Sequence, residues 1–193
     1  MAWAYIAVYL GMLVVSAVTT LRRDPELIAE RSRVKPGTKG WDKVLSNATM
    51  FGVTGSILVA GLDVRFGWTA GFNLALELAA LALVALGFAL LNWAMSANRF
   101  FSAVVRIQTE RGHTVATGGP YRYVRHPGYV AMILVTLMTA PALGSLWALI
   151  PAGIGAGGTI LRTVLEDATL QAELPGYREY TRQVRYRLVP GLW

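Results

Sequence analysis

The sequence predicts an all-α membrane protein, a polytopic bundle of about five transmembrane helices. Hydrophobic residues make up 54% of the 193-residue chain and charged residues only 15%, whereas an average soluble chain carries about 25% charged residues. The apolar residues fall in long runs, and a membrane-spanning helix needs about 20 of them. A chain of this length therefore forms one compact bundle without a separate soluble domain.

Five apolar segments are the candidate spans. In chain order they cover residues 3–21, 44–62, 72–97, 129–142 and 143–161. The fourth is shorter than a full span of about 20 residues, and the turn-forming sequence Pro141–Ser145 predicts a hairpin between it and the fifth. We interpret residues 1–193 as one domain, in which residues 1–97 form a three-span scaffold. Residues 98–193 then carry a binding loop, a helical hairpin and a C-terminal tail.

The basic residues predict how the bundle is oriented. The loop after the first span, the loop after the third span and the tail from Arg162 hold all of the 18 Lys and Arg residues except Arg65. Because cytoplasmic loops collect Lys and Arg, we expect the N-terminus outside and the C-terminus in the cytoplasm. The net charge of +7 then reflects topology and contact with membrane lipids. Nucleic-acid binding is not expected, because the charges border apolar spans.

Two local patterns predict further structure. The segment Asp24–Arg31 has the start signals of a short helix, which we expect to lie at the membrane interface. Gly52 with Ser56, and Gly153 with Gly157, have the spacing at which small residues let membrane helices pack closely.

The block Gly118–Tyr129 brings turn residues, basic side chains and aromatic rings together just before the fourth span. Turns need Gly and Pro, Arg and His bind anions, and flat ligands need aromatic walls. This block therefore predicts a site for a charged cofactor at the cytoplasmic face. We expect the segments Arg162–Asp167 and Leu174–Trp193 to lie beside it.

Four acidic and basic side chains in these segments suggest how the cofactor binds. A carboxylate of Glu166 or Asp167 could accept both hydroxyls of a ribose, while Arg125 and His126 could hold a carboxylate. The alternative is that the two acids only pair with neighbouring arginines at the interface.

Thiol and metal chemistry are not expected. The chain has no Cys, which excludes disulfides, thiolate nucleophiles and Cys-ligated metals. Its two His residues, His113 and His126, lie in a turn-rich segment without the spacing of a helical metal site. A hydrogen bond within the loop is the simplest role for His113.

Four motifs follow one another in the C-terminal half: Gly112–Tyr121, Arg125–Tyr129, Arg162–Asp167 and Tyr177–Tyr180, with Pro190 after them. In this order, over residues 96–190, they resemble the isoprenylcysteine carboxyl methyltransferases and their prokaryotic relatives, membrane enzymes that use S-adenosylmethionine. The family is also related to phospholipid N-methyltransferases. Where it usually has paired Glu, this chain has Glu166 and Asp167, which leaves the acid chemistry intact.

The resemblance implies methyl transfer from S-adenosylmethionine to a lipophilic acceptor that comes from the bilayer, either a small molecule or a prenylated substrate. Arg125, His126 and Glu166 are then the catalytic residues. Arg125 and His126 would bind the methionine carboxylate or orient the acceptor, and Glu166 would hold the ribose or the amino group. These three would also bind the cofactor, and the resemblance adds the cofactor-binding residues His113, Val115, Gly119, Pro120, Tyr121, Tyr129, Tyr177 and Tyr180.

The acceptor and two other classes of protein stay open. A carboxylate acceptor is already ionised near neutral pH, whereas an amine acceptor would need His126 or Glu166 to take a proton. One of the other classes is an integral-membrane NADPH-dependent reductase, because membrane sterol reductases resemble this family in the same C-terminal region. A transporter or scaffold should have ionisable residues deep in several spans, and only Glu77 lies within one.

Overall fold

The computed structural model describes residues 1–23 and 37–193, so the expected short helix at residues 24–31 lies outside the described part. All regular elements in the described residues are helices, which confirms the all-α class and the helical membrane bundle. Three helices are long and apolar enough to cross a membrane. They are α1 (Ala2–Arg23), α3 (Gly40–Phe66) and α4 (Leu74–Ala97). They correspond to the first three predicted spans.

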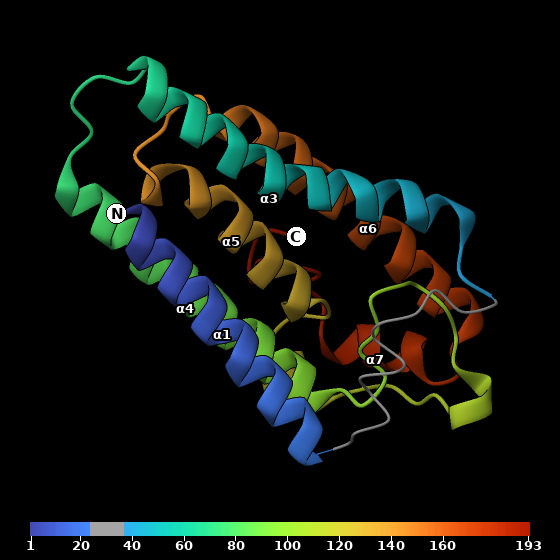
Figure 1. The fold of residues 1–193 in the computed structure, drawn as a ribbon. Helices are drawn as coiled ribbons and strands as arrows, with labels where there is room; N and C mark the ends of the chain where they lie inside the picture. The colour runs from blue at the N-terminus through green and yellow to red at the C-terminus, as the bar shows by residue number, and fades with distance from the viewer. Residues whose placement is uncertain (24–36) are drawn as a thin grey trace.

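Three further helices lie in the C-terminal half. They are α5 (Pro127–Ala142), α6 (Leu149–Glu173) and the short α7 (Tyr177–Gln183). In Figure 1, α3 runs beside α6, α1 runs beside α4, and α5 lies between these two pairs. At one end of the bundle, which we call the site end, α3 and α5 begin, α4 and α6 end, and α7 packs nearby. At the opposite end, the hairpin end, α5 turns into α6.

The predicted limits of the fifth span are wrong. We expected residues 143–161, whereas α6 covers Leu149–Glu173. It starts later because the chain turns after α5: Gly144 has a left-handed φ of 69°, and the Ser145 hydroxyl donates to the carboxylate of Asp63 on α3. It ends later because the helix continues past the apolar run to the site end. The predicted hairpin itself is confirmed, since α5 ends at Ala142.

Glycine allows α3 and α6 to pack closely. A Cβ atom on Gly52 would lie 2.6 Å from the Cα atom of Gly155, and the reverse holds for a Cβ on Gly155. Gly52 is thus a packing glycine, as expected, but its partner is Gly155. A Cβ atom on Gly153 or Gly157, which we expected to pack, would have no neighbouring atom within 4 Å. Small residues therefore let the two helices pack closely, but α6 uses the face of Gly155 and not the face of Gly153 and Gly157.

Large apolar side chains cover the outside of the three long helices. Leu10 on α1, Leu58 on α3 and Leu86 on α4 are all exposed. A water-soluble protein rarely exposes so much apolar surface, and lipid would cover it in a membrane.

Candidate functional site

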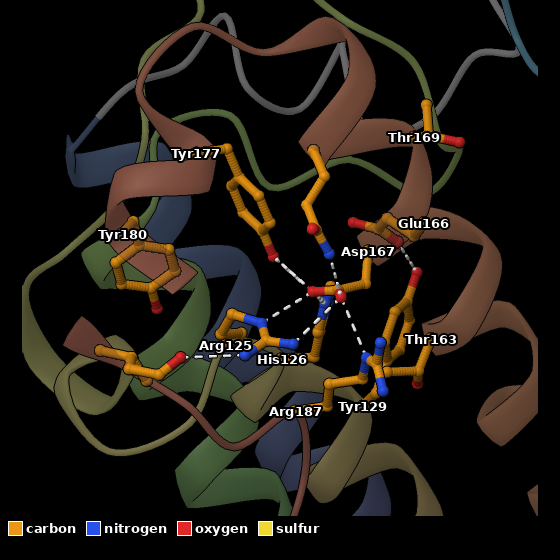
Figure 2. Close-up of polar contacts among 12 residues, drawn as sticks. Arg125, His126, Tyr129, Thr163, Glu166, Asp167, Thr169, Tyr177, Tyr180 and Arg187 are labelled. Atoms are coloured by element: carbon orange, nitrogen blue, oxygen red, sulfur yellow. Dashed lines mark hydrogen bonds and ion pairs between the residues drawn. The ribbon is translucent and has the colours of Figure 1, made fainter. Parts of the chain in front are cut away.

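Asp167 is the centre of the polar network at the site end (Figure 2). Its side chain is 0% exposed and accepts hydrogen bonds from two arginines, a histidine, a tyrosine and a glutamine. The donor atoms are Arg125 Nε at 2.8 Å and Nη2 at 3.0 Å, His126 Nε2 at 3.1 Å, Tyr177 Oη at 3.0 Å, Arg187 Nε at 2.9 Å and Gln171 Nε2 at 2.8 Å. Asp167 therefore joins α6, the start of α5, α7 and the tail.

The charge of Asp167 is fixed by these donors. Asp167 lies beyond the apolar part of α6, and its burial alone would raise the pKa of the carboxyl group. Hydrogen bonds from His126, Arg125 and Arg187 outweigh burial and hold the pKa of Asp167 well below its usual range. Asp167 is consequently an ionised anchor, and burial with this anion raises the pKa of Tyr177, which remains a hydroxyl donor.

The Arg-His-Pro sequence places Arg125 and His126 for this network. Pro127 opens α5, a position that suits its fixed φ and missing N–H. The backbone N–H groups of Arg125 and His126 donate to the carbonyls of Tyr186 and Arg187 at 2.9 and 3.0 Å. The Arg125 Nη1 atom also donates to the carbonyls of residues 184 and 185. The start of α5 is thereby fastened to the tail.

The ring of Tyr129 forms a second part of the site, next to Asp167 (Figure 2). It stacks on the His126 ring at 5.7 Å between centroids, and the Arg162 guanidinium lies 5.3 Å from its centroid. The Tyr129 hydroxyl donates to the carboxylate of Glu166. Glu166 and Asp167 thus have different partners although they are adjacent in sequence.

A buried ion pair supports Tyr129 from α3. Asp42, which is 0% exposed, accepts from Arg162 Nε at 2.6 Å and Nη2 at 3.3 Å. Asp42 also accepts from the Val105 N–H, and Arg162 donates to the Ala103 carbonyl. The pair connects α3, α6 and the loop after α4.

A cavity of about 910 Å³ brings most of the predicted site residues together. All of them except Gly119 and Pro120 line it. Glu166, His113 and Tyr177 belong to its polar part, at the site end. The apolar part continues between the long helices, where it is lined by Tyr9 from α1, Met50 and Val53 from α3, Leu91 and Met95 from α4 and Met132 from α5.

His113 is a neutral side chain of this cavity. Burial is the largest cause that lowers its pKa, to about 4, and the nearby Arg106 and Arg111 add to it. Its Nδ1 atom accepts the Gln108 N–H at 3.2 Å, so the proton of the neutral ring is on Nε2. Its ring also lies 4.5 Å from that of Phe100. The expected loop hydrogen bond is present, and a donor atom remains.

Gly119 lies against α4 instead of the cavity. Its φ is 57°, and a Cβ atom there would lie 2.8 Å from the Ala97 Cβ and 3.0 Å from the Trp93 Nε1. The following Pro120 is buried in the same short turn. We therefore assign these two residues to packing.

The sequence does not single out Asp42, it places Arg162 only within a segment beside the site, and it leaves open whether Glu166 or Asp167 faces the cofactor. Asp167 was expected beside Glu166, but nothing in the pair shows which of them is buried. For Asp42 a signal exists, because an acid at the start of an apolar run between basic residues needs a partner when buried.

Among residues 1–23 and 37–193, no group of His, Asp or Glu side chains could hold a metal ion.

Part of the chain is similar in sequence to a known protein family. Residues 80–165 match the isoprenylcysteine carboxyl methyltransferase family, and no curated protein matches the chain. The match covers most of α4, all of α5 and most of α6, including Arg125, His126 and Tyr129. It confirms the predicted resemblance and supports an assignment to this family of methyltransferases.

Proposed function

We propose that this protein, whose residues 80–165 match the isoprenylcysteine carboxyl methyltransferase family, transfers a methyl group from S-adenosylmethionine to a carboxylate on a lipophilic acceptor. One observation carries the proposal: a single cavity has polar residues at the site end and apolar residues between the long helices. A reaction between a polar cofactor and a lipid requires both kinds of surface in one place.

The residues of the polar part fit this cofactor. The Glu166 carboxylate receives the Tyr129 hydroxyl, and its remaining lone pairs can accept from ribose hydroxyls or the amino group. The Nε2 proton of His113 can donate to an adenine nitrogen, and Phe100 and Tyr121 supply aromatic surface beside it. When bound, S-adenosylmethionine supplies a sulfonium methyl group: the acceptor oxygen forms the new C–O bond as the C–S bond breaks, and the electron pair stays on sulfur.

Arg125 and His126 have positioning roles in this proposal. Their side chains bind Asp167, and their backbone holds the tail over the site. The His126 ring also stacks on the Tyr129 ring, and the Tyr129 hydroxyl holds Glu166. Direct contact of Arg125 or His126 with the methionine carboxylate stays a prediction from the resemblance.

The acceptor needs alignment and a dry site more than a dedicated base. A carboxylate is ionised near pH 7, so no proton has to leave it before it attacks the methyl group. Apolar walls exclude water and hold the lipophilic part of the acceptor, so that the carboxylate can lie in line with the methyl group. Met50 lines the cavity and is 67% exposed on the outside of α3, which supports access for the acceptor from the bilayer.

The membrane orientation belongs to the same proposal. We place the site end at the cytoplasmic face, because the Lys and Arg residues of the described part of the chain, apart from Arg65, lie in segments near that end. Arg65 lies near the hairpin end of α3. In this arrangement α5 and α6 cross the membrane as a hairpin beside the three long apolar helices.

Transfer of a labelled methyl group tests the function and the acceptor together. Purified protein would be incubated with tritium-labelled S-adenosylmethionine and either N-acetyl-S-farnesyl-L-cysteine or phosphatidylethanolamine. We expect the label to appear in N-acetyl-S-farnesyl-L-cysteine and to be released by base, because a methyl ester is base-labile and an N-methyl amine is not. Glu166→Gln should lose activity, whereas Glu173→Gln, a change of an exposed acid on the same helix, should keep it. Base-stable label in the phospholipid would contradict the carboxylate acceptor, and no label in either would contradict the proposed substrates.

A further inference from the structure

We propose that one face of α3, formed by Lys43, Ser46 and Asn47, binds an anionic head group of the acceptor. We call it the α3 head-group site. The inference rests on the proposed function, and it adds the residues that recognise the negative charge of the acceptor. All three residues lie outside residues 80–165, the part that matches the family.

The three side chains share one helix face that lines the cavity. Residues three and four apart are neighbours on a helix surface, so Lys43 lies beside Ser46 and Asn47. The same face continues with Met50 and Val53, which are also cavity-lining. Along α3 the cavity wall thus changes from basic to polar to apolar, the order that an amphiphile with an acidic head group would match.

Charge pairing distinguishes Lys43 from the other basic residues of the cavity. Arg106 pairs with Glu110, Arg125 with Asp167, and Arg162 with Asp42. Lys43 has no acidic partner among the residues that the structure describes. Its ammonium group is therefore available to an anion in the cavity, and it would repel the ammonium head group of an amine acceptor.

Ser46 supplies a second, independent observation. Its Oγ atom is buried and has no hydrogen-bond partner in the described structure. Buried polar atoms nearly always have a hydrogen-bond partner, and a buried polar atom without one destabilises the protein. The Asn47 amide also lines the cavity, and no hydrogen bond to it occurs in the described residues. One carboxylate or phosphate group could accept from the serine hydroxyl, the amide and the lysine together.

The α3 head-group site lies close to the level of Glu166, the carboxylate that the proposed function assigns to the cofactor. Asp42, adjacent to Lys43 in sequence, pairs with Arg162, and the next turn of α6 carries Glu166. About two turns further along α3 from Asp42, the hydroxyl groups of Thr49 and Thr159 of α6 form a hydrogen bond of 3.0 Å. A head group held by Lys43 is thereby placed near the polar part of the cavity, with its tail along Met50.

Binding of a matched pair of probes tests the site without turnover. Calorimetry would compare N-acetyl-S-geranyl-L-cysteine with its neutral carboxamide, using protein in low-salt detergent. We expect the acid to bind at least about tenfold more tightly, as a charge-assisted contact allows. Lys43→Met should remove this preference and Lys43→Arg should keep most of it. Arg182→Met, which removes an exposed charge from α7, should change nothing.

Lipid competitors distinguish the two sources of an anion. Phosphatidylglycerol and uncharged monoolein would each be added to the acid probe. Selective displacement by phosphatidylglycerol would assign the site to lipid phosphates, and resistance to it would assign the site to carboxylates. Equal affinity of wild type for acid and carboxamide would overturn the proposal, as would an undiminished preference in Lys43→Met.

Cofactor binding allows the α3 head-group site and the proposed function to be rejected separately. Binding of S-adenosylhomocysteine would be measured in the same Lys43→Met protein, where we expect it to be unchanged. Normal cofactor binding without any acid preference would reject only the α3 head-group site. Absence of cofactor binding in wild type would reject the methyltransferase itself.

Discussion

Replacing Asp167 by Asn is the perturbation that the structure predicts in most detail. The change keeps the size of the side chain and removes the charge that Arg125 and Arg187 bind. The neutral amide also presents an NH₂ group to donors that now face an oxygen. Arg125 is buried, so it would retain only its contacts with the tail carbonyls.

The expected cost follows from this burial. Removing one partner of a buried ion pair costs about 3–5 kcal/mol, because the remaining charge stays uncompensated. For a chain of this size, 1 kcal/mol shifts the melting temperature by about 2–4 °C. Asp167→Asn should therefore melt about 6–20 °C below wild type in detergent. Cofactor affinity should also fall, since the tail loses the charged contact between Arg187 and Asp167 that helps to hold it over the site.

Glu166→Gln is the matched control, because it makes the same chemical change at the adjacent position. Glu166 is only partly buried and has a tyrosine hydroxyl, not an arginine, as its partner. We expect it to melt close to wild type and to lose affinity for S-adenosylhomocysteine. The reasoning would be refuted if Asp167→Asn melted like wild type, or if the two variants were equally destabilised.

Three other predictions concern packing, support of the site and pH. Gly52→Ala places a methyl group against the α6 backbone and should destabilise the protein by about 1–3 kcal/mol, whereas Gly61→Ala, in open space on the same helix, should stabilise it by up to about 1 kcal/mol; equal melting temperatures would contradict this. Asp42→Asn leaves Arg162 without its carboxylate and should lower both the melting temperature and the affinity for S-adenosylhomocysteine. A loss of stability with unchanged affinity would remove Asp42 from the support of the site. Because the folded-state pKa of His113, about 4, lies below its ordinary value of 6.5, its contribution to stability is complete above pH 6.5 and lost as the pH falls toward 4. The melting temperature should depend less on pH in this range for His113→Gln than for wild type, and the same pH dependence in both proteins would count against the assignment.

The membrane bundle could be predicted because apolar runs report burial in lipid directly. The limits of α6 could not, because its last turns are held by particular partners and not by hydropathy. Arg162 is charged and would end an apolar run, yet it lies inside the helix because Asp42 neutralises it. These two residues are 120 positions apart in the chain, and no local pattern connects them.

The candidate site was predicted as a set of segments more accurately than as a set of roles. Turn, basic and aromatic residues identified the start of α5, and this segment does line the cavity. The division of labour between Glu166 and Asp167 was not predictable, because adjacent helix positions differ by about 100° in direction. Only the packing of α7 and the tail decides which carboxylate is enclosed. The position of Gly119 against α4 was not predictable for a similar reason, since a glycine in a turn can face a ligand or a neighbouring helix.

Calorimetric titration of the purified protein with S-adenosylhomocysteine and, in parallel, with NADPH tests the central claim most directly. The account predicts that S-adenosylhomocysteine binds, that NADPH does not, and that Glu166→Ala abolishes the binding while the melting temperature stays near that of wild type. Binding of NADPH alone would contradict the account and identify a reductase. Binding of neither ligand would contradict an enzyme that uses either cofactor.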